Sequence, residues 1–235
     1  MKKSVILISM LIIASCSKTT SNIENAKKSI ESKYPNIQIT SIEKINQSFF
    51  EVRVGTEIYY LTSDLKHLIA GNIIEMSSGK NLTENSYKQT RLEYLSQITD
   101  NDVISYTSKD SKHTLTIFTD TSCPYCQKLH NEIKELVSNG ISVNYVLFSR
   151  NGNDTEAYKD MVSVWCSDDR QYALDMLFDN SFVDSKTCEN PISNNYTKAM
   201  NLQVNGTPMI FFEDGSVIPG YVASDKIIDA LKASH

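Results

Sequence analysis

The sequence predicts a chain of two parts: a small α+β module, then a connecting helix and a larger α/β domain with a helical insertion. Apolar residues alternate with period two between residues 37 and 60, which is the pattern of half-buried strands. Strand-like and helix-like runs alternate between residues 114 and 148, as in a βαβ unit with a parallel sheet. With 235 residues and 40% hydrophobic composition, the chain can bury both cores.

The first module is expected over residues 17–80. Apolar residues recur at helical spacing before Pro35, which ends the predicted helix. They are Ile23, Ala26, Ile30 and Tyr34. Period-two runs follow over residues 37–39, 50–54 and 58–60, and another strand-like run covers residues 68–76. One helix and about four strands make a small α+β module.

Residues 81–99 are predicted to form a linker helix that Thr83 caps and that runs to about Ile98. The second domain is then expected over residues 100–235. Its predicted elements are a strand at 114–119, a helix from Pro124, a strand at 143–148, a helical insertion between 151 and 202, strands at 209–212 and 216–218, and a last helix capped by Ser224.

The N-terminal residues 1–16 have the pattern of an export signal. Lys2 and Lys3 give a positive start, and residues 5–14 form an apolar run that is too short to span a bilayer. Small residues precede Cys16, as in lipoprotein signals whose cysteine is lipidated and becomes the first mature residue. An ordinary signal peptide that contains a cysteine is the alternative. Either one places the mature protein outside the cytoplasm.

The charge of the chain narrows the classes of molecule that we expect it to bind. The formal net charge is −5, and the lysines are scattered along the sequence. Proteins that bind nucleic acid gather basic residues against phosphates, so we expect no nucleic-acid partner. Folded proteins, small acids and thiols remain as substrates, and we expect no cofactor.

The five cysteines suggest two pairs in an oxidising compartment, because Cys16 belongs to the signal or anchor. Cys123 and Cys126 make one natural pair, and Cys166 and Cys188 make the other.

The segment Cys123-Pro124-Tyr125-Cys126 follows a predicted strand and begins a predicted helix. Positions i and i+3 share a helix face, so the two sulfurs can form a disulfide. At the helix start, free backbone N–H groups and the helix dipole favour a Cys123 thiolate, whereas Cys126 is expected to be buried and less acidic. Cys123 is therefore the expected nucleophile and Cys126 the resolving thiol. An inert disulfide and half of a zinc site are the alternatives, but the histidines lack ligand spacing, and we expect no metal.

Thr207 and Pro208 supply a second element of this site. In the thioredoxin superfamily, which this pattern resembles, the proline that starts the late strand is cis and packs against the two cysteines. A cis peptide here would present the Thr207 backbone as a free edge that an extended substrate can join. Tyr125, between the cysteines, is expected to be exposed, where it can tune the cysteine pair and contact substrates. A simple helix-surface tyrosine is the alternative. An ordinary trans proline entering an edge strand is the alternative.

Nearly the whole mature chain resembles the periplasmic disulfide isomerases of the DsbC type. The matching segments are Ile58 to Asp64, Asn81-Leu82-Thr83-Glu84, Ile117-Phe118-Thr119-Asp120, Cys123 to Cys126, Lys128-Leu129-His130, Trp165-Cys166, Gly206-Thr207-Pro208 and Ile218-Pro219-Gly220-Tyr221. The resemblance implies an N-terminal dimerisation domain, a linker helix and a thioredoxin-fold domain with a helical insertion.

It further implies a periplasmic homodimer whose cleft holds misoxidised exported proteins, and a membrane reductase of the DsbD type that keeps Cys123 and Cys126 reduced. Cys166 and Cys188 match the structural disulfide of this family, with a second redox center as the alternative. His130 lies about two helical turns after Cys123, so we expect a solvated or capping role for it.

Two residues depart from the family pattern. Pro124 stands where better-known isomerases carry glycine, and Gln127 stands where a histidine is common. The residues between the cysteines change the balance of thiolate and disulfide, so the redox potential does not follow from the resemblance. A monomeric oxidase or glutaredoxin-like reductase is one alternative, although such enzymes lack an N-terminal module. A thiol-independent periplasmic chaperone is the other.

Overall fold

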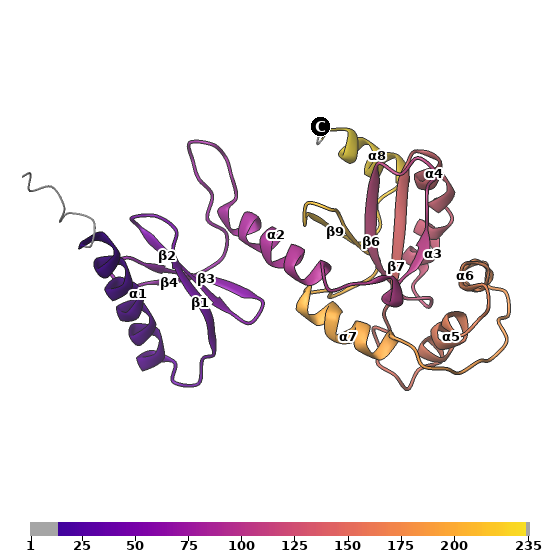
Figure 1. The fold of residues 1–235 in the computed structure, drawn as a ribbon, viewed down its shortest axis with the longest axis horizontal. Coiled ribbons are helices and arrows are strands. Elements are labelled where there is room, and N and C mark those ends of the chain that lie inside the picture. Colours follow the sequence, from indigo (N-terminus) through magenta and orange to yellow (C-terminus); the bar gives the residue numbers. More distant parts are fainter. Residues whose placement is uncertain (1–13, 234–235) are drawn as a thin grey trace, which may run out of the picture. The chain divides into compact units, whose positions relative to one another are not determined.

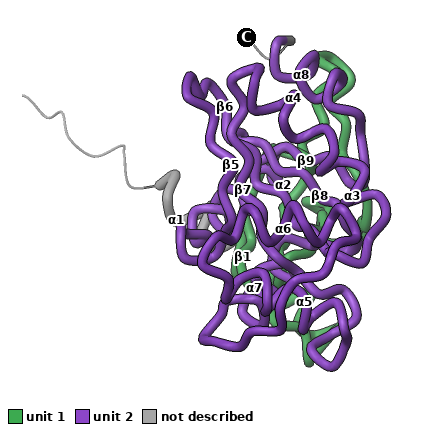
Figure 2. Tube along the Cα trace, turned by 90° about the vertical axis from the view of Figure 1, so that its right-hand side faces the viewer, with its two compact units in different colours: residues 1–84 green, residues 85–235 purple. Residues whose placement is uncertain are grey.

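The computed structural model describes residues 14–233, and side chains over residues 22–232. The predicted signal segment 1–16 lies outside the described residues except for its last three. Met1–Glu84 and Asn85–His235 form two compact units (Figures 1 and 2). No helix in the described part of the chain is both long enough and apolar enough to cross a membrane.

The first unit is a helix packed on a four-stranded antiparallel sheet in the order β1-β2-β3-β4. Its elements are α1 (Ala14–Lys33), β1 (Ile39–Lys44), β2 (Phe49–Val54), β3 (Glu57–Thr62) and β4 (Leu68–Ala70). The helix buries Ala26 and Ile30 against Phe50, Val52 and Leu61 of the sheet. The predicted helical spacing and strand alternation therefore produce the core of this unit.

The predicted strand over residues 68–76 is wrong beyond its first three residues. β4 ends at Ala70, and Gly71 follows with a φ of +150°. The chain then turns away from the sheet, Ile74 pairs only with Asn81 in an isolated bridge, and Met76 is 92% exposed. A glycine in this conformation ends the strand, because residues with a Cβ rarely adopt it.

Thr83 does not cap helix α2 (Leu82–Leu95), contrary to the sequence prediction. It lies inside the first turn, and its hydroxyl accepts hydrogen bonds from the Tyr60 hydroxyl and the Ile73 backbone N–H, both at 2.9 Å. Asn81 takes the capping role instead, since its Oδ1 accepts from the Glu84 N–H at 3.0 Å. Thr83 thus attaches the start of α2 to the first sheet.

The second unit contains a five-stranded sheet in the order β5-β7-β6-β8-β9. The strands are β5 (Ile104–Tyr106), β6 (His113–Thr119), β7 (Ile141–Leu147), β8 (Met209–Phe211) and β9 (Val217–Pro219). β6 and β7 are parallel, as the alternating pattern predicted, and β8 is antiparallel to β6. β6, which leads into the cysteine pair, is therefore the central strand.

Helices surround this sheet, and α5, α6 and α7 form the insertion between β7 and β8 (Figure 1). The helical elements are η1 (Asp100–Asp102), α3 (Pro124–His130), α4 (Ile133–Ser138), α5 (Glu156–Trp165), α6 (Arg170–Phe178), α7 (Ile192–Asn201) and α8 (Ser224–Ala233). The helix predicted from Pro124 is interrupted after His130. Ser224 is the first residue of α8, and its hydroxyl donates to Glu135 at 2.6 Å instead of capping the helix.

Candidate active site

The two cysteines lie where β6 passes into α3. Cys123 is the N-cap residue of α3, with an extended backbone, and Pro124 takes the first helical position. A proline suits that position because its φ is preset and it has no N–H to leave unpaired. The Cys126 N–H donates to the Cys123 carbonyl at 3.0 Å, which closes the first turn. Both thiols are free, with Cys123 3% and Cys126 1% exposed.

The two thiols have opposite acidities. Burial alone would raise the pKa of Cys123, but hydrogen bonds from the Thr207 side chain and from the Cys126 and Tyr125 N–H groups outweigh it and lower the pKa below 9.0. Burial raises the pKa of Cys126 to about 11, although the Asp120 backbone and the Thr119 side chain oppose the change. The site therefore contains one activated thiol and one thiol held protonated.

Thr207 and Pro208 lie against the cysteines, and the peptide bond between them is cis. The Cys123 Sγ is 3.2 Å from the Thr207 carbonyl oxygen. Thr207 is itself buried. β8 begins directly after Pro208, so the central sheet holds this segment beside the start of α3.

An ion pair between the buried Asp120 and the partly exposed Arg150, which sequence reasoning missed, supports the loop before Cys123. Asp120 Oδ1 accepts from the backbone N–H and hydroxyl of Ser122, at 2.9 and 2.6 Å. Its Oδ2 accepts from the Arg150 backbone N–H and Nε, at 3.1 and 3.0 Å. Burial would lower the pKa of Arg150, but its bond to Asp120 and the charge of that carboxylate raise it. Negative charge on either cysteine raises it further, so the guanidinium lies within electrostatic reach of both thiols. In the sequence, the one signal for this ion pair was Asp120, an aspartate between a predicted strand and the cysteines.

Tyr125 is 63% exposed and stacks on Tyr221, with ring centroids 6.4 Å apart. Lys128 lies over the Tyr221 ring, with its Nζ 4.4 Å from the ring centroid. The Tyr221 hydroxyl donates a hydrogen bond to Glu132. An aromatic surface fixed by charged groups therefore adjoins the cysteine pair.

The expectation that His130 is solvated is wrong. Its side chain is 6% exposed, its Nε2 lies 2.9 Å from Asp175 Oδ1, and its ring stacks on Phe178 at 4.5 Å. Asp175 and Phe178 both belong to α6, so the inserted helix covers this face of α3. Gln127 contacts the same helix, since its side chain donates to the Phe178 carbonyl.

Cys166 and Cys188 form a disulfide that joins the end of α5 to the segment before α7. The described residues contain no group of three or more potential ligands that could hold a metal ion. The side chain of Cys16, the possible lipidation site, lies outside the described residues.

A central strand that ends at a Cys-x-x-Cys helix start, beside a cis proline, defines a thioredoxin-fold protein of thiol-disulfide exchange. Residues 99–235 match the family described as "Thioredoxin-like domain", and residues 17–84 match the "Disulfide bond isomerase protein N-terminal domain". The chain belongs to the DsbC family of thiol:disulfide interchange proteins, and it is an enzyme of that class.

Curated relatives support this assignment over most of the chain. The chain is 34% identical to the thiol:disulfide interchange protein DsbC of Dickeya dadantii, covering 100% of this chain and 98% of the relative. It is 37% identical to DsbC of Salmonella typhimurium and 32% identical to DsbC of Escherichia coli, covering 70% and 72% of this chain and 68% and 71% of the relatives.

Solved structures show the fold of the second unit. A disulfide interchange protein from Neisseria gonorrhoeae is 23% identical, with a TM-score of 0.51 over 57% of this chain and 97% of that protein. The catalytic domain of Proteus mirabilis ScsC is 21% identical, with a TM-score of 0.51 over 64% of this chain and 99% of that domain.

Proposed function

We propose that Cys123 is the nucleophile and Cys126 the resolving thiol of a protein disulfide isomerase. The single observation that carries this proposal is the opposite acidity of the two thiols on one helical turn. The Cys123 thiolate attacks a substrate disulfide, one substrate sulfur leaves as a thiolate, and a mixed disulfide forms. If a substrate thiol then attacks the substrate sulfur of the mixed disulfide, the substrate is isomerised. If Cys126 attacks Cys123, the substrate is reduced and the Cys123–Cys126 disulfide forms.

Substrates would bind along the Thr207–Pro208 edge. Backbone pairing with Thr207 would place a substrate sulfur near Cys123, which lies 3.2 Å from the Thr207 carbonyl. The exposed Tyr125 and its stacked partner Tyr221 would contact apolar segments of an unfolded substrate. Such binding depends little on sequence, which suits an enzyme that acts on many misoxidised proteins.

Family membership supports three further proposals on organisation. Residues 17–80 would form a dimerisation domain, residues 81–99 a linker helix and residues 100–235 the catalytic domain of a homodimer. The protein would act on exported proteins in the periplasm after loss of its signal segment within residues 1–16. Cleavage before Cys16 would leave this cysteine as a lipid anchor, and cleavage after it would leave a chain without that anchor. A membrane reductase of the DsbD type would keep Cys123 and Cys126 reduced.

Refolding of a scrambled multi-disulfide protein tests the assignment of the thiols. We expect wild type to restore the native pairing, Cys123→Ser to lose this activity, and Cys126→Ala to retain part of it while accumulating mixed disulfides. Tyr172→Phe, a change on an exposed ring, is the matched control. Full biological activity in a variant without both thiols would instead support the thiol-independent chaperone.

Sedimentation of the full chain tests the homodimer. We expect twice the mass of one chain at micromolar concentration. A monomer with oxidase or glutaredoxin-like reductase activity would favour the alternative enzyme class.

A further inference from the structure

Arg150 binds the short segment that leads into Cys123. Residues 120–122 join the end of β6 to this cysteine, and we refer to them as the 120–122 loop. The Arg150 backbone N–H and Nε both donate to Asp120 Oδ2, at 3.1 and 3.0 Å, and its Nη2 donates to Ser122 Oγ at 3.4 Å. One arginine therefore contacts the first and the last residue of the loop.

The central sheet brings Arg150 to this position. β7 ends at Leu147, whose register partner is Thr119, the last residue of β6. The Phe148 N–H continues the pairing, since it donates to the Thr119 carbonyl at 2.9 Å. Arg150 follows two residues later, where the chain that leaves β6 is within reach of its side chain. The contact is thus fixed by the pairing of the two strands.

The 120–122 loop also bonds the first turn of α3. The Cys123 N–H donates to the Asp120 carbonyl at 3.0 Å, and the Cys123 carbonyl accepts from the Cys126 N–H at the same distance. Asp120 therefore binds Arg150 through its carboxylate and Cys123 through its backbone. Any displacement of the arginine would reach the cysteine through a continuous series of hydrogen bonds.

The two charges of the ion pair differ in their surroundings. The Asp120 side chain is 1% exposed, and its carboxylate accepts four hydrogen bonds from Ser122 and Arg150. The guanidinium is one-third exposed and extends past the carboxylate to Ser122, the residue next to Cys123. Burial would lower the pKa of Arg150, but Asp120 and then negative charge on either thiol raise it. A thiolate and this guanidinium therefore stabilise each other.

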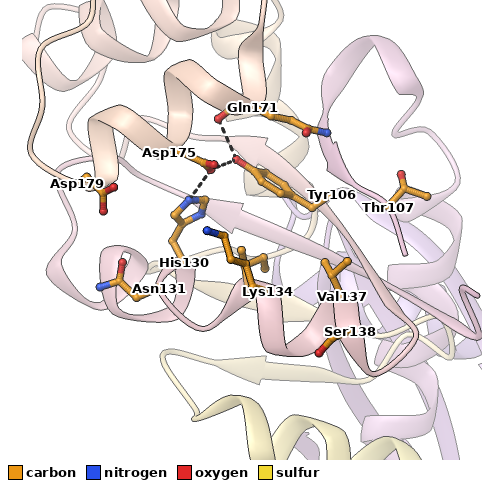
Figure 3. Close-up of a pocket in the computed structure, with 11 residues that line it drawn as sticks. Tyr106, Thr107, His130, Asn131, Lys134, Val137, Ser138, Gln171, Asp175 and Asp179 are labelled. Atoms are coloured by element: carbon orange, nitrogen blue, oxygen red, sulfur yellow. Dashed lines mark hydrogen bonds and ion pairs between the residues drawn. The ribbon is translucent and has the colours of Figure 1, made fainter. Parts of the chain in front are cut away.

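Two buried rings near the cysteine pair carry no charge near neutral pH. Burial raises the pKa of Tyr145 well above 10.0, and burial lowers the pKa of His130. The charged Asp175 bonds His130 Nε2 and the Tyr106 hydroxyl, at 2.9 and 2.6 Å (Figure 3). Because His130 is seven residues after Cys123, Asp175 contacts α3 about two turns beyond the nucleophile.

We infer that Arg150 is a positioning residue that stabilises the Cys123 thiolate and so favours the reduced cysteine pair over its disulfide. This inference rests on the proposed role of Cys123 as the nucleophile. When two glutathione molecules reduce the pair, the Cys123–Cys126 bond breaks and one glutathione disulfide forms. The two electrons pass from the glutathione sulfurs to the cysteines, one proton goes to Cys126 and the other to water. Cys123 remains a thiolate, so its stabilisation shifts this equilibrium toward the reduced pair.

Variants at the two ends of the ion pair separate an electrostatic role from a structural one. Arg150→Met removes the positive charge and leaves Asp120 negative, so iodoacetamide should alkylate Cys123 about 3- to 10-fold more slowly near neutral pH. The equilibrium with glutathione should shift toward the disulfide by about the same factor. Asp120→Asn leaves the guanidinium unopposed and should shift both quantities in the opposite direction. Loss of loop structure alone would shift both variants in the same direction.

Two control variants accompany these measurements. Arg150→Lys keeps the charge but loses the planar group that binds two partners, so it should lower stability and retain most of the alkylation rate. Asp175→Asn removes a carboxylate whose bonds reach α3 further along the helix, and it should leave the alkylation of Cys123 unchanged (Figure 3). The alkylation rates of wild type and Arg150→Met should converge in alkaline buffer, where Cys123 is ionised in both proteins.

A double variant keeps the test decisive if Arg150→Met does not fold. Asp120→Asn combined with Arg150→Met removes both charges, and its Cys123 should react more slowly than that of Asp120→Asn alone. Shifts of the same sign in both single variants, or equal rates in the double variant and Asp120→Asn, would overturn the role of Arg150. If Cys123 is not the faster thiol of wild type, the proposed nucleophile is wrong instead.

Discussion

The Cys123 Sγ lies 3.2 Å from the carbonyl oxygen of Thr207, a residue 84 positions away in the sequence. The contact joins the start of α3 to the cis Thr207–Pro208 segment ahead of β8. A substrate strand that pairs with the Thr207 backbone would therefore reach the nucleophilic sulfur with little rearrangement. The proposed substrate edge and the proposed nucleophile therefore meet at one backbone position.

Titration of the reduced protein should show two separate thiol steps. Hydrogen bonds to the sulfur hold the pKa of Cys123 below 9.0, so its thiolate forms first and persists to lower pH than a free thiol. Burial places the second step, that of Cys126, at a pKa of about 11. Ultraviolet thiolate absorbance measures both steps, and Cys126→Ala should remove only the second. A single step near 9.0 for both thiols would contradict the assignment.

Thr207→Val should raise the pKa of Cys123. The Thr207 side chain is the largest influence that lowers this pKa, and valine keeps the shape while removing the hydroxyl. Alkylation of Cys123 near neutral pH should therefore slow several-fold, and the rates should converge in alkaline solution. The variant should remain folded, because valine fills the same buried volume as threonine. An unchanged pH profile would rule out this role.

Asp120→Asn should destabilise the protein by about 2 kcal/mol, because it breaks charge-assisted bonds to Arg150. The effect is no larger because the Arg150 side chain is one-third exposed and solvent screens its charge. Burial would raise the pKa of Asp120, but bonds from Ser122 and Arg150 hold it below 3.8. Its contribution is thus present above pH 3.8 and is lost as the pH falls through the lower folded value.

Urea unfolding of wild type and Asp120→Asn at neutral and acid pH measures this effect. The difference in unfolding free energy should narrow in acid. Asp184→Asn, at an exposed position, should change stability little at either pH. A constant difference across the pH range would show that the carboxylate charge is not responsible.

Loss of the Cys166–Cys188 disulfide should lower stability without abolishing exchange. The bond joins residues 22 positions apart, and closing a loop of that size stabilises by about 3 kcal/mol on the chain-entropy account. Urea unfolding and disulfide reduction assays on the double alanine variant measure the two properties. Unaltered stability with lost exchange activity would make this pair a second redox center.

Local sequence signals predicted the frame of the site well. The run into Cys123 is a strand followed by a proline at the first helical position, and both features depend on neighbouring residues alone. The parallel pairing of β6 with β7 follows from the alternation of strand and helix. These predictions needed no knowledge of distant contacts.

Local sequence signals did not predict the contacts between segments that are far apart in the sequence. Asp120 and Arg150 are 30 positions apart and meet only because β6 and β7 end side by side. His130 is buried because α6 of the insertion packs over it, and spacing on α3 alone gives no account of that helix. Thr83 has the residue type of a helix cap, but Tyr60 and Ile73 use its hydroxyl instead.

The disulfide in the helical insertion also bears on how this enzyme matures. Cys166 and Cys188 pair with each other while Cys123 and Cys126 stay free, yet four thiols allow other pairings during folding. Cys123 and Cys126 precede both partners in the sequence, so either can capture Cys166 before Cys188 is available. The folding chain thus has to select one cysteine pairing among several, which is the kind of reaction that thiol:disulfide interchange proteins carry out.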